Sequence, residues 1–325
     1  MSVKTITFSL LFSVVSSLLY SQDTLKSYNK ELTAITENDN YNFTLRDRYY
    51  TNGIFLRFNW LAKKDPNQRV LKTINRIETG QMMFNSYYNR RSVERVLQTM
   101  DRPYAGWLYA SYGQTKVFSN QDVMKYDAVV GILGPAALGK QVQTGFHKLF
   151  MLYDIYGWEY QVKNEIGLNA SFQYFHSLIK KRAGQNVTLH AEGKAMLGNT
   201  FTNASAGLLL KFGNMEPEEN SSYWSGRLGE SYEKSKHKIE AFGFLEPVFM
   251  VQAYNATVQG GLLRTDKGLY TSPLNSFNYV IKGGFMISDR RAAISVTYTL
   301  KQKEAKTMID KMEIYGAFGL SFRFR

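Results

Sequence analysis

The stretch MEIYGAFGLSFRFR, residues 312–325, decides the fold class. One alternate set of its residues is largely apolar: Met312, Ile314, Gly316, Phe318, Leu320, Phe322 and Phe324. The other set consists of Glu313, Tyr315, Ala317, Gly319, Ser321, Arg323 and Arg325. Because successive side chains of a β-strand point to opposite faces, this period of two predicts a strand with one oily and one wet face.

The same alternation recurs through most of the chain, for example over residues 54–60, 166–174, 204–212 and 292–300. Amphipathic segments of about ten residues, separated by turns, are typical of transmembrane β-strands. A soluble sandwich or lipocalin-like barrel alternates equally well, with its oily face turned inward. The 22 Tyr and 21 Phe, which suit aromatic girdles, and the presence of only six Pro favour the membrane barrel.

The beginning of the chain predicts export. Lys4 precedes an apolar stretch from Ile6 to Tyr20 that only small hydroxyl residues interrupt. This pattern is typical of a secretory signal peptide over residues 1–21, which leaves residues 22–325 as a single domain. No later segment has 18 uninterrupted apolar residues, so membrane residence would require a barrel rather than helices.

Composition narrows the function classes. The chain has no Cys, which excludes a disulfide framework, a thiolate nucleophile and cysteine metal ligands. Its net charge of +13 is spread along the sequence rather than gathered in one arm. For an exported protein, the partners that we expect are anionic lipid or glycolipid phosphates rather than nucleic acid.

Two segments depart from the strand pattern. Residues 88–100 and 136–150 both have apolar residues at helical spacing. In the second segment, Gln143 and His147 are one turn apart, away from the face that carries Leu138, Val142 and Phe146. A helix here would follow the Gly134-Pro135 break and lie in a loop outside the bilayer core.

Four histidines are present, and His147 is the candidate for chemistry. His190 lies on the polar face of a predicted strand, His176 follows a strand end, and His237 stands in the charged run KSKHK. A lone histidine is more often a hydrogen-bonded structural residue than a base, and that interpretation stays open for His147 as well.

Oxygen-bearing side chains cluster early in the mature chain. Residues 37–40 read ENDN, and Asp47 and Thr51-Asn52-Gly53 follow. Calcium binds six to eight such oxygens, but this run lacks the spacing of an EF-hand. An ordinary polar turn that leads into a strand is an equally good interpretation.

Five segments, in this order, together resemble the lipid A 3'-O-deacylase family: ENDN (37–40), DRYYTNG (47–53), DRPYAGWLY (101–109), GP (134–135) with QxxxH (143–147), and GWxxQxxNE (157–165). The resemblance implies an outer-membrane β-barrel of twelve strands with an active site at the outward rim, beside a loop helix. It also implies hydrolysis of the 3'-linked acyl chains of lipid A in lipopolysaccharide, by a protein expected to be a monomer.

The resemblance further implies individual roles. His147 would activate water for attack on the ester, while Asn38, Asp39 and Thr51 would surround the oxyanion and a divalent cation, expected to be Ca²⁺. Asp154 is the nearest acid after the histidine and is expected to complete the metal ligands. The chemistry is coherent, because a neutral imidazole accepts a proton near neutral pH and a cation stabilises the charge that develops on the carbonyl.

The DRPYAGW segment is expected to be architectural. Asp101 and Arg102 could pair near the rim, and Tyr104, Trp107 and Tyr109 suit an interfacial girdle.

Two other functions remain open. A serine-dependent outer-membrane phospholipase would need a hydroxyl beside a histidine, and no histidine here has Ser two positions later. A non-enzymatic porin or adhesion barrel would use the lumen as a channel, and it predicts that His147 is dispensable.

Overall fold

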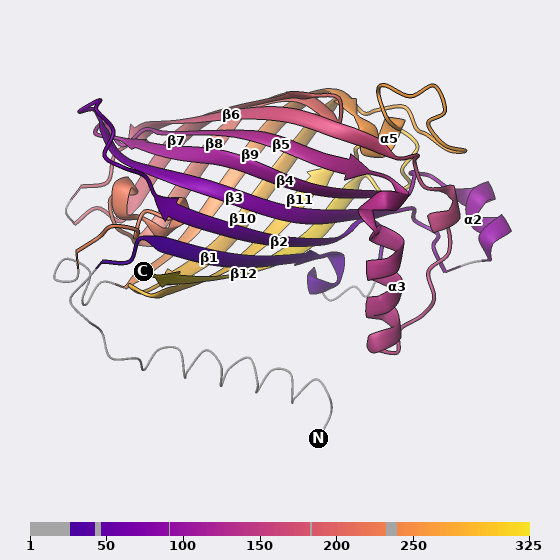
Figure 1. The fold of residues 1–325 in the computed structure, drawn as a ribbon, viewed down its shortest axis with the longest axis horizontal. Helices are drawn as coiled ribbons and strands as arrows, with labels where there is room; N and C mark the ends of the chain where they lie inside the picture. Colours follow the sequence, from indigo (N-terminus) through magenta and orange to yellow (C-terminus); the bar gives the residue numbers. More distant parts are fainter. Residues whose placement is uncertain (1–26, 43–46, 91, 183, 232–238) are drawn as a thin grey trace.

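The computed structural model describes residues 27–42, 47–90, 92–182, 184–231 and 239–325. Within these residues, twelve antiparallel strands close into a barrel in which β12 pairs with β1 (Figure 1). The strands are β1 (Lys30–Asn38), β2 (Tyr49–Leu61), β3 (Val70–Asn85), β4 (Ala105–Phe118), β5 (Val123–Leu133), β6 (Glu165–Ile179), β7 (Val187–Gly198), β8 (Phe201–Asn214), β9 (Glu240–Asn255), β10 (Phe277–Ser288), β11 (Ala292–Gln302) and β12 (Met312–Phe324). The predicted all-β antiparallel barrel and its strand number are confirmed. The predicted signal peptide, residues 1–21, lies outside the described residues.

The barrel is apolar outside and charged inside. On the outer face, Phe249 is 74% exposed and Leu197 is 72% exposed. On the inner face, Lys211 and Arg323 are fully buried at 0%. A soluble barrel turns its apolar residues inward, so this arrangement fits a wall that contacts lipid. The alternation in residues 312–325 therefore faces the way that the membrane interpretation requires.

The two ends of the barrel differ. Both chain ends of the barrel, at β1 and β12, lie at one end, where most connections are short (Figure 1). The opposite end carries the longer connections, over residues 86–104, 134–164 and 256–276. In outer-membrane barrels the short turns are periplasmic and the long loops are extracellular. We call the end with the long connections the outer rim.

One long connection lies at the end with the chain termini. Residues 215–231, between β8 and β9, include η4 (Glu218–Asn220) and η5 (Ser222–Trp224). The fully buried Glu218 pairs with Lys211 of the inner wall at 2.5 Å, and the Trp224 ring lies 4.8 Å from that of Phe175. This connection therefore packs inside the barrel, where an open porin would have a channel.

The helices lie in connections. At the outer rim these are η1 (Asp39–Asn42), α2 (Val93–Thr99), η2 (Pro135–Ala137), α3 (Gly139–Leu149), η3 (Trp158–Tyr160) and α5 (Ala256–Gln259). The helices predicted within residues 88–100 and 136–150 are confirmed as α2 and α3. None of the helices in the described ranges is long and apolar enough to cross a membrane.

Candidate functional site

The position of the site depends on how closely α3 packs against the barrel. Two glycines allow close contact: a Cβ on Gly139 would lie 2.7 Å from the Trp158 ring, and one on Gly106 of β4 would lie 3.1 Å from the Cβ of Ala137. The first contact is shorter than real Cβ atoms make and the second is tighter than most, so a larger residue at Gly139 would push the helix away. The start of α3 is therefore held against β4 at the outer rim.

Gln143 bonds the middle of α3 to the barrel and to the connection after the helix. Its Oε1 accepts hydrogen bonds from Asn85 Nδ2 at 3.0 Å and from Trp158 Nε1 at 2.8 Å. The Gln143 side chain is buried, although its type is usually exposed. Because residues four apart share a helix face, His147 is carried toward the barrel with it.

His147 meets an acid from the segment before β2. Its Nε2 lies 3.4 Å from Oδ2 of Asp47, and both side chains are almost fully buried. Its Nδ1 lies 2.6 Å from the carbonyl oxygen of Tyr153, and the Tyr153 hydroxyl donates to the same carboxylate of Asp47. A carbonyl can only accept, so Nδ1 carries the hydrogen and Nε2 is the basic nitrogen of the neutral ring.

These contacts change the acidity of the ring. Burial lowers the pKa of His147, but the hydrogen bonds to Asp47 and to the Tyr153 carbonyl outweigh burial, and the pKa is raised above its usual value. Both partners favour the protonated ring, because each is an acceptor. The site is thus built to stabilise the imidazolium that forms when the histidine takes a proton.

Asn38 lies on the outer face of the wall. Exposed Leu32 of β1 and exposed Ile54 of β2 mark the outward-facing positions, which alternate along each strand. Asn38 and Asn52 belong to the same two sets and are partners in the β1–β2 register. The site therefore lies outside the lumen, between the barrel wall and α3.

Asp39 lies beside Asp47. Its Oδ2 accepts a hydrogen bond from the backbone N–H of Arg48 at 2.6 Å, one residue after Asp47. Burial, and then the negative charge of Asp47, raise the pKa of Asp39 well above its usual range. Two buried carboxylates repel each other, and Asp47 already faces His147, so Asp39 favours either a proton or a bound cation.

The donor set partly fits a hard cation. Buried side-chain oxygens of Asp39, Asn40 and Asn52 have no hydrogen-bond partner among the described residues. Asn38 Oδ1 accepts from the backbone N–H of Asn40 at 2.7 Å and keeps a second lone pair. In the described part of the chain no three His, Asp or Glu side chains gather as metal ligands, so a cation here would depend on amide oxygens, which calcium accepts.

Of the two remaining predicted residues, Thr51 is buried in the barrel wall and Asp154 is exposed. Thr51 is fully buried at an irregularity in the β2–β3 register, and its hydroxyl donates to the Met83 carbonyl at 3.3 Å. Such bulges often lie next to active sites, where they redirect a side chain. Asp154 is exposed, and the acid beside His147 is Asp47 instead. The pairing of Asp47 with His147 had no signal in the spacing of the sequence.

The DRPYAGW segment is architectural, but not as predicted. Asp101 and Arg102 do not pair with each other: Asp101 accepts from Tyr49 Oη at 2.7 Å, and Arg102 forms a buried ion pair with Glu304 at 2.7 Å. The predicted girdle is wrong for its aromatic residues. Tyr104 and Trp107 are buried, and Tyr109 points into the barrel, where it donates to Glu78 at 2.7 Å. They face inward because this segment ties the outer-rim connections together.

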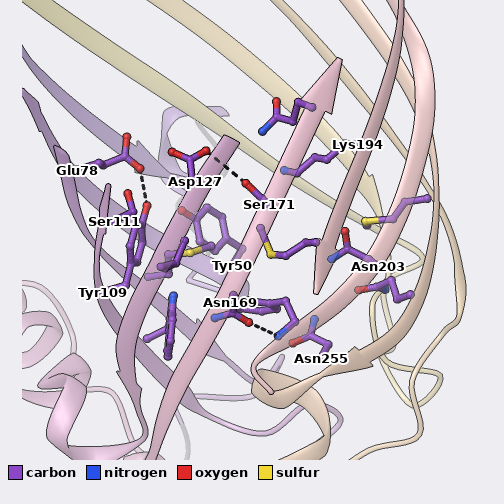
Figure 2. Close-up of a pocket in the computed structure, with 18 of the residues that line it drawn as sticks. Tyr50, Glu78, Tyr109, Ser111, Asp127, Asn169, Ser171, Lys194, Asn203 and Asn255 are labelled. Carbon is purple, nitrogen blue, oxygen red and sulfur yellow. Dashed lines mark hydrogen bonds between the residues drawn. The ribbon is translucent and has the colours of Figure 1, made fainter. Parts of the chain in front are cut away.

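A cavity in the lumen lies apart from this site. It has a volume of about 520 Å³, and Figure 2 shows polar and charged side chains around it. Its carboxylates already have partners: Glu78 pairs with Arg57 at 2.6 Å, and Asp127 pairs with Arg76 at 2.5 Å. A network satisfied in this way stabilises the lumen. The pair of His147 and Asp47 is not part of its lining.

Comparisons with known proteins agree with this architecture. Over most of its length the chain is similar to LpxR from Salmonella typhimurium, with a TM-score of 0.73 at 20% identity, covering 90% of this chain and 100% of that one. The translocator domain of the autotransporter NalP from Neisseria meningitidis is more distant, with a TM-score of 0.45 at 9% identity, covering 99% of this chain and 96% of that one. No curated protein matches in sequence. The model of the family described as "Outer membrane protein LpxR" matches residues 6–324. The chain therefore belongs to the LpxR family and is an outer-membrane β-barrel protein.

Proposed function

We propose that this protein is an esterase that removes the 3'-linked acyl chains of lipid A from the outer leaflet. The observation that carries the proposal is a buried His147–Asp47 pair on the outer face of the barrel, at the rim. A site in that place lies on the lipid-facing side of the wall rather than on the side of the lumen. Membership of the LpxR family and the fold shared with the Salmonella protein support the substrate class.

The chain's own residues would move the proton. Nδ1 of His147 is bonded to the Tyr153 carbonyl, so Nε2 takes the proton of the attacking water. The Asp47 carboxylate then stabilises the protonated ring at 3.4 Å. The Tyr153 hydroxyl donates to Asp47 and holds that carboxylate in place. Water is the nucleophile in this scheme, and no serine hydroxyl bonds to His147 among the described residues.

A calcium ion is part of the proposal. Asn38 and Asp39 would hold it together with unpartnered amide oxygens nearby, and Thr51, the neighbour of Asn52 in β2, would contribute beside them. A bound cation would supply electrostatic stabilisation of the ester oxyanion. Asp154, exposed after the end of α3, would be a further ligand of the ion.

Mass spectrometry of lipid A tests the proposal. Lipid A from cells that express the intact protein should lose the mass of its 3'-linked acyl chains. Cells that express His147→Ala or Asp47→Asn should keep it. Gln141→Ala, at an exposed position of α3, is the matched control and should behave as the wild type. Unchanged lipid A with a correctly inserted wild-type protein would contradict the proposal.

The same experiment separates the rival functions. A phospholipase would release fatty acid from glycerophospholipid and leave lipid A intact, so both lipids should be analysed. A porin or adhesion barrel would change neither. The packed connection of residues 215–231 does not favour a channel, because it lies inside the barrel.

A further inference from the structure

The exposed side of α3 is unusual for a helix in water. Its polar residues Gln143 and His147 are buried, whereas Leu149 is 74% exposed and Met151 is 90% exposed. The exposed apolar residues at this end of the helix are Phe146, Leu149, Phe150, Met151 and Leu152, which we call the α3 tip. A helix that contacts water on one side normally exposes its polar face, so the surroundings of the α3 tip are not simply aqueous.

The α3 tip is held in a defined shape. The Phe146 and Phe150 rings lie 4.6 Å apart. The backbone N–H of Phe150 donates to the Phe146 carbonyl at 3.1 Å, and that of Leu152 donates to the His147 carbonyl at 2.8 Å. Beyond the tip, the Arg90 guanidinium stacks 3.4 Å from the centre of the Tyr153 ring. The exposed apolar residues therefore belong to an ordered element.

The position of α3 indicates what it meets. The helix starts against the outer face of β4 and runs across the direction of the barrel axis, and its C-terminal end projects past the outline of the wall (Figure 1). The outer wall in the same region exposes Ile54 and Leu56 of β2. The α3 tip is thus an extension of the apolar surface by which the barrel contacts lipid.

We propose that the α3 tip inserts among the acyl chains of the outer leaflet and anchors the outer rim there. Exposed Lys148, between Phe146 and Leu149, would keep its ammonium group at the level of the lipid phosphates. Insertion sets the depth of His147, on the opposite side of the same helix. This inference concerns lipid contact and stands whether or not the protein hydrolyses lipid A.

α2 provides a comparison within the same rim. Glu94, Arg95 and Gln98 are exposed on it, and its one exposed large apolar residue is Leu97, so it has no apolar cluster like the α3 tip. A helix with that surface stays in water or among headgroups. At the same end of the barrel, α3 is therefore expected to insert into lipid and α2 is expected to remain outside it.

The absence of Cys from the chain makes the test direct. The full-length mature protein would carry Leu149→Cys, Met151→Cys or, as the control, Gln98→Cys, each labelled with a polarity-sensitive fluorophore. The labelled proteins would be reconstituted in phosphatidylcholine vesicles with or without brominated acyl chains. Heat-modifiability on gels would establish that each variant has folded.

Labels at 149 and 151 should show blue-shifted fluorescence, and brominated acyl chains should quench most of that fluorescence. The label at 98 should instead be quenched by iodide in the aqueous phase. Tip labels that brominated chains quench no more than the label at 98 would overturn the proposal. Occupancy by a second copy would also overturn it, and would appear as disulfide-linked dimers of Met151→Cys or as self-quenching that depends on the ratio of protein to lipid. Because no readout depends on hydrolysis, failure of this inference is distinguishable from failure of the proposed function.

Discussion

Asp47→Asn removes the negative charge beside His147 while keeping the shape of the side chain. The two groups are 3.4 Å apart and almost fully buried, so water screens their interaction weakly. An opposite charge at this range stabilises the protonated ring, so the pKa of His147 should fall when the charge is removed. The ring is partly protonated in the transition state and loses part of the same stabilisation there, so the reaction should slow by about 10- to 100-fold, which is less than the loss of the base itself.

The sign of the pH effect follows from the role of a base. His147 accepts a proton only when its ring is neutral, so activity should fall as the pH drops through its pKa. Because the pKa is raised, the wild-type midpoint should lie above the reference value of about 6.5. Asp47→Asn should move that midpoint to lower pH and reduce the plateau rate as well.

The assay is deacylation of purified lipid A in detergent micelles from about pH 5 to 9, a range that spans the reference pKa of histidine. Glu94→Gln, which removes one exposed carboxylate from α2 at the same rim, is the charge control and should keep the wild-type profile. If the pH–activity profile of Asp47→Asn kept the wild-type midpoint, whatever its plateau rate, the assignment of Asp47 as the partner of the base would be refuted.

Further outcomes are expected. His147→Ala should lower deacylation on the order of 10²- to 10⁴-fold, whereas Gln141→Ala should not, as measured by lipid A mass spectrometry. Chelation should abolish activity, and calcium should restore it better than magnesium. Asp39→Asn should weaken the restoration by calcium, and full activity in excess chelator would remove the metal from the scheme. Gly139→Leu should clash with Trp158, cost about 1–3 kcal/mol of α3 docking and lower activity while the barrel still inserts; unchanged activity would mean that the docking is dispensable. The wild-type protein should be heat-modifiable on gels and resist carbonate extraction, and release by mild washing would contradict a membrane barrel.

Much of the fold was predictable because its signal is local. Glu313 and Arg323 of β12 are buried while Ile314 and Phe318 are exposed, as the alternation in that stretch predicts. The position of α3 after Gly134-Pro135 was predictable for the same reason, since helical spacing and a break are both read within a few residues.

The DRPYAGW segment is a case in which the local sequence pattern did not predict the environment of the side chains. Its aromatic residues match an interfacial girdle in composition, yet Tyr104 and Trp107 are buried. Composition does not distinguish a lipid interface from the packed interior of a rim, because both accept large amphipathic rings. The partner of Arg102 is Glu304, from the connection between β11 and β12, which only the closed barrel brings near.

The sequence by itself determined a series of amphipathic β-strands, because side-chain alternation is a property of each strand and does not depend on its neighbours, and its composition favoured a membrane barrel. It also marked His147 as the candidate base. Only the tertiary structure decided that Asp47 is its partner and that Asp154 is exposed. The physical reason is that the pair forms when the connection after β5 lies across the outer wall beside the segment before β2, and that contact depends on the side-by-side pairing of β2 to β5 in the sheet.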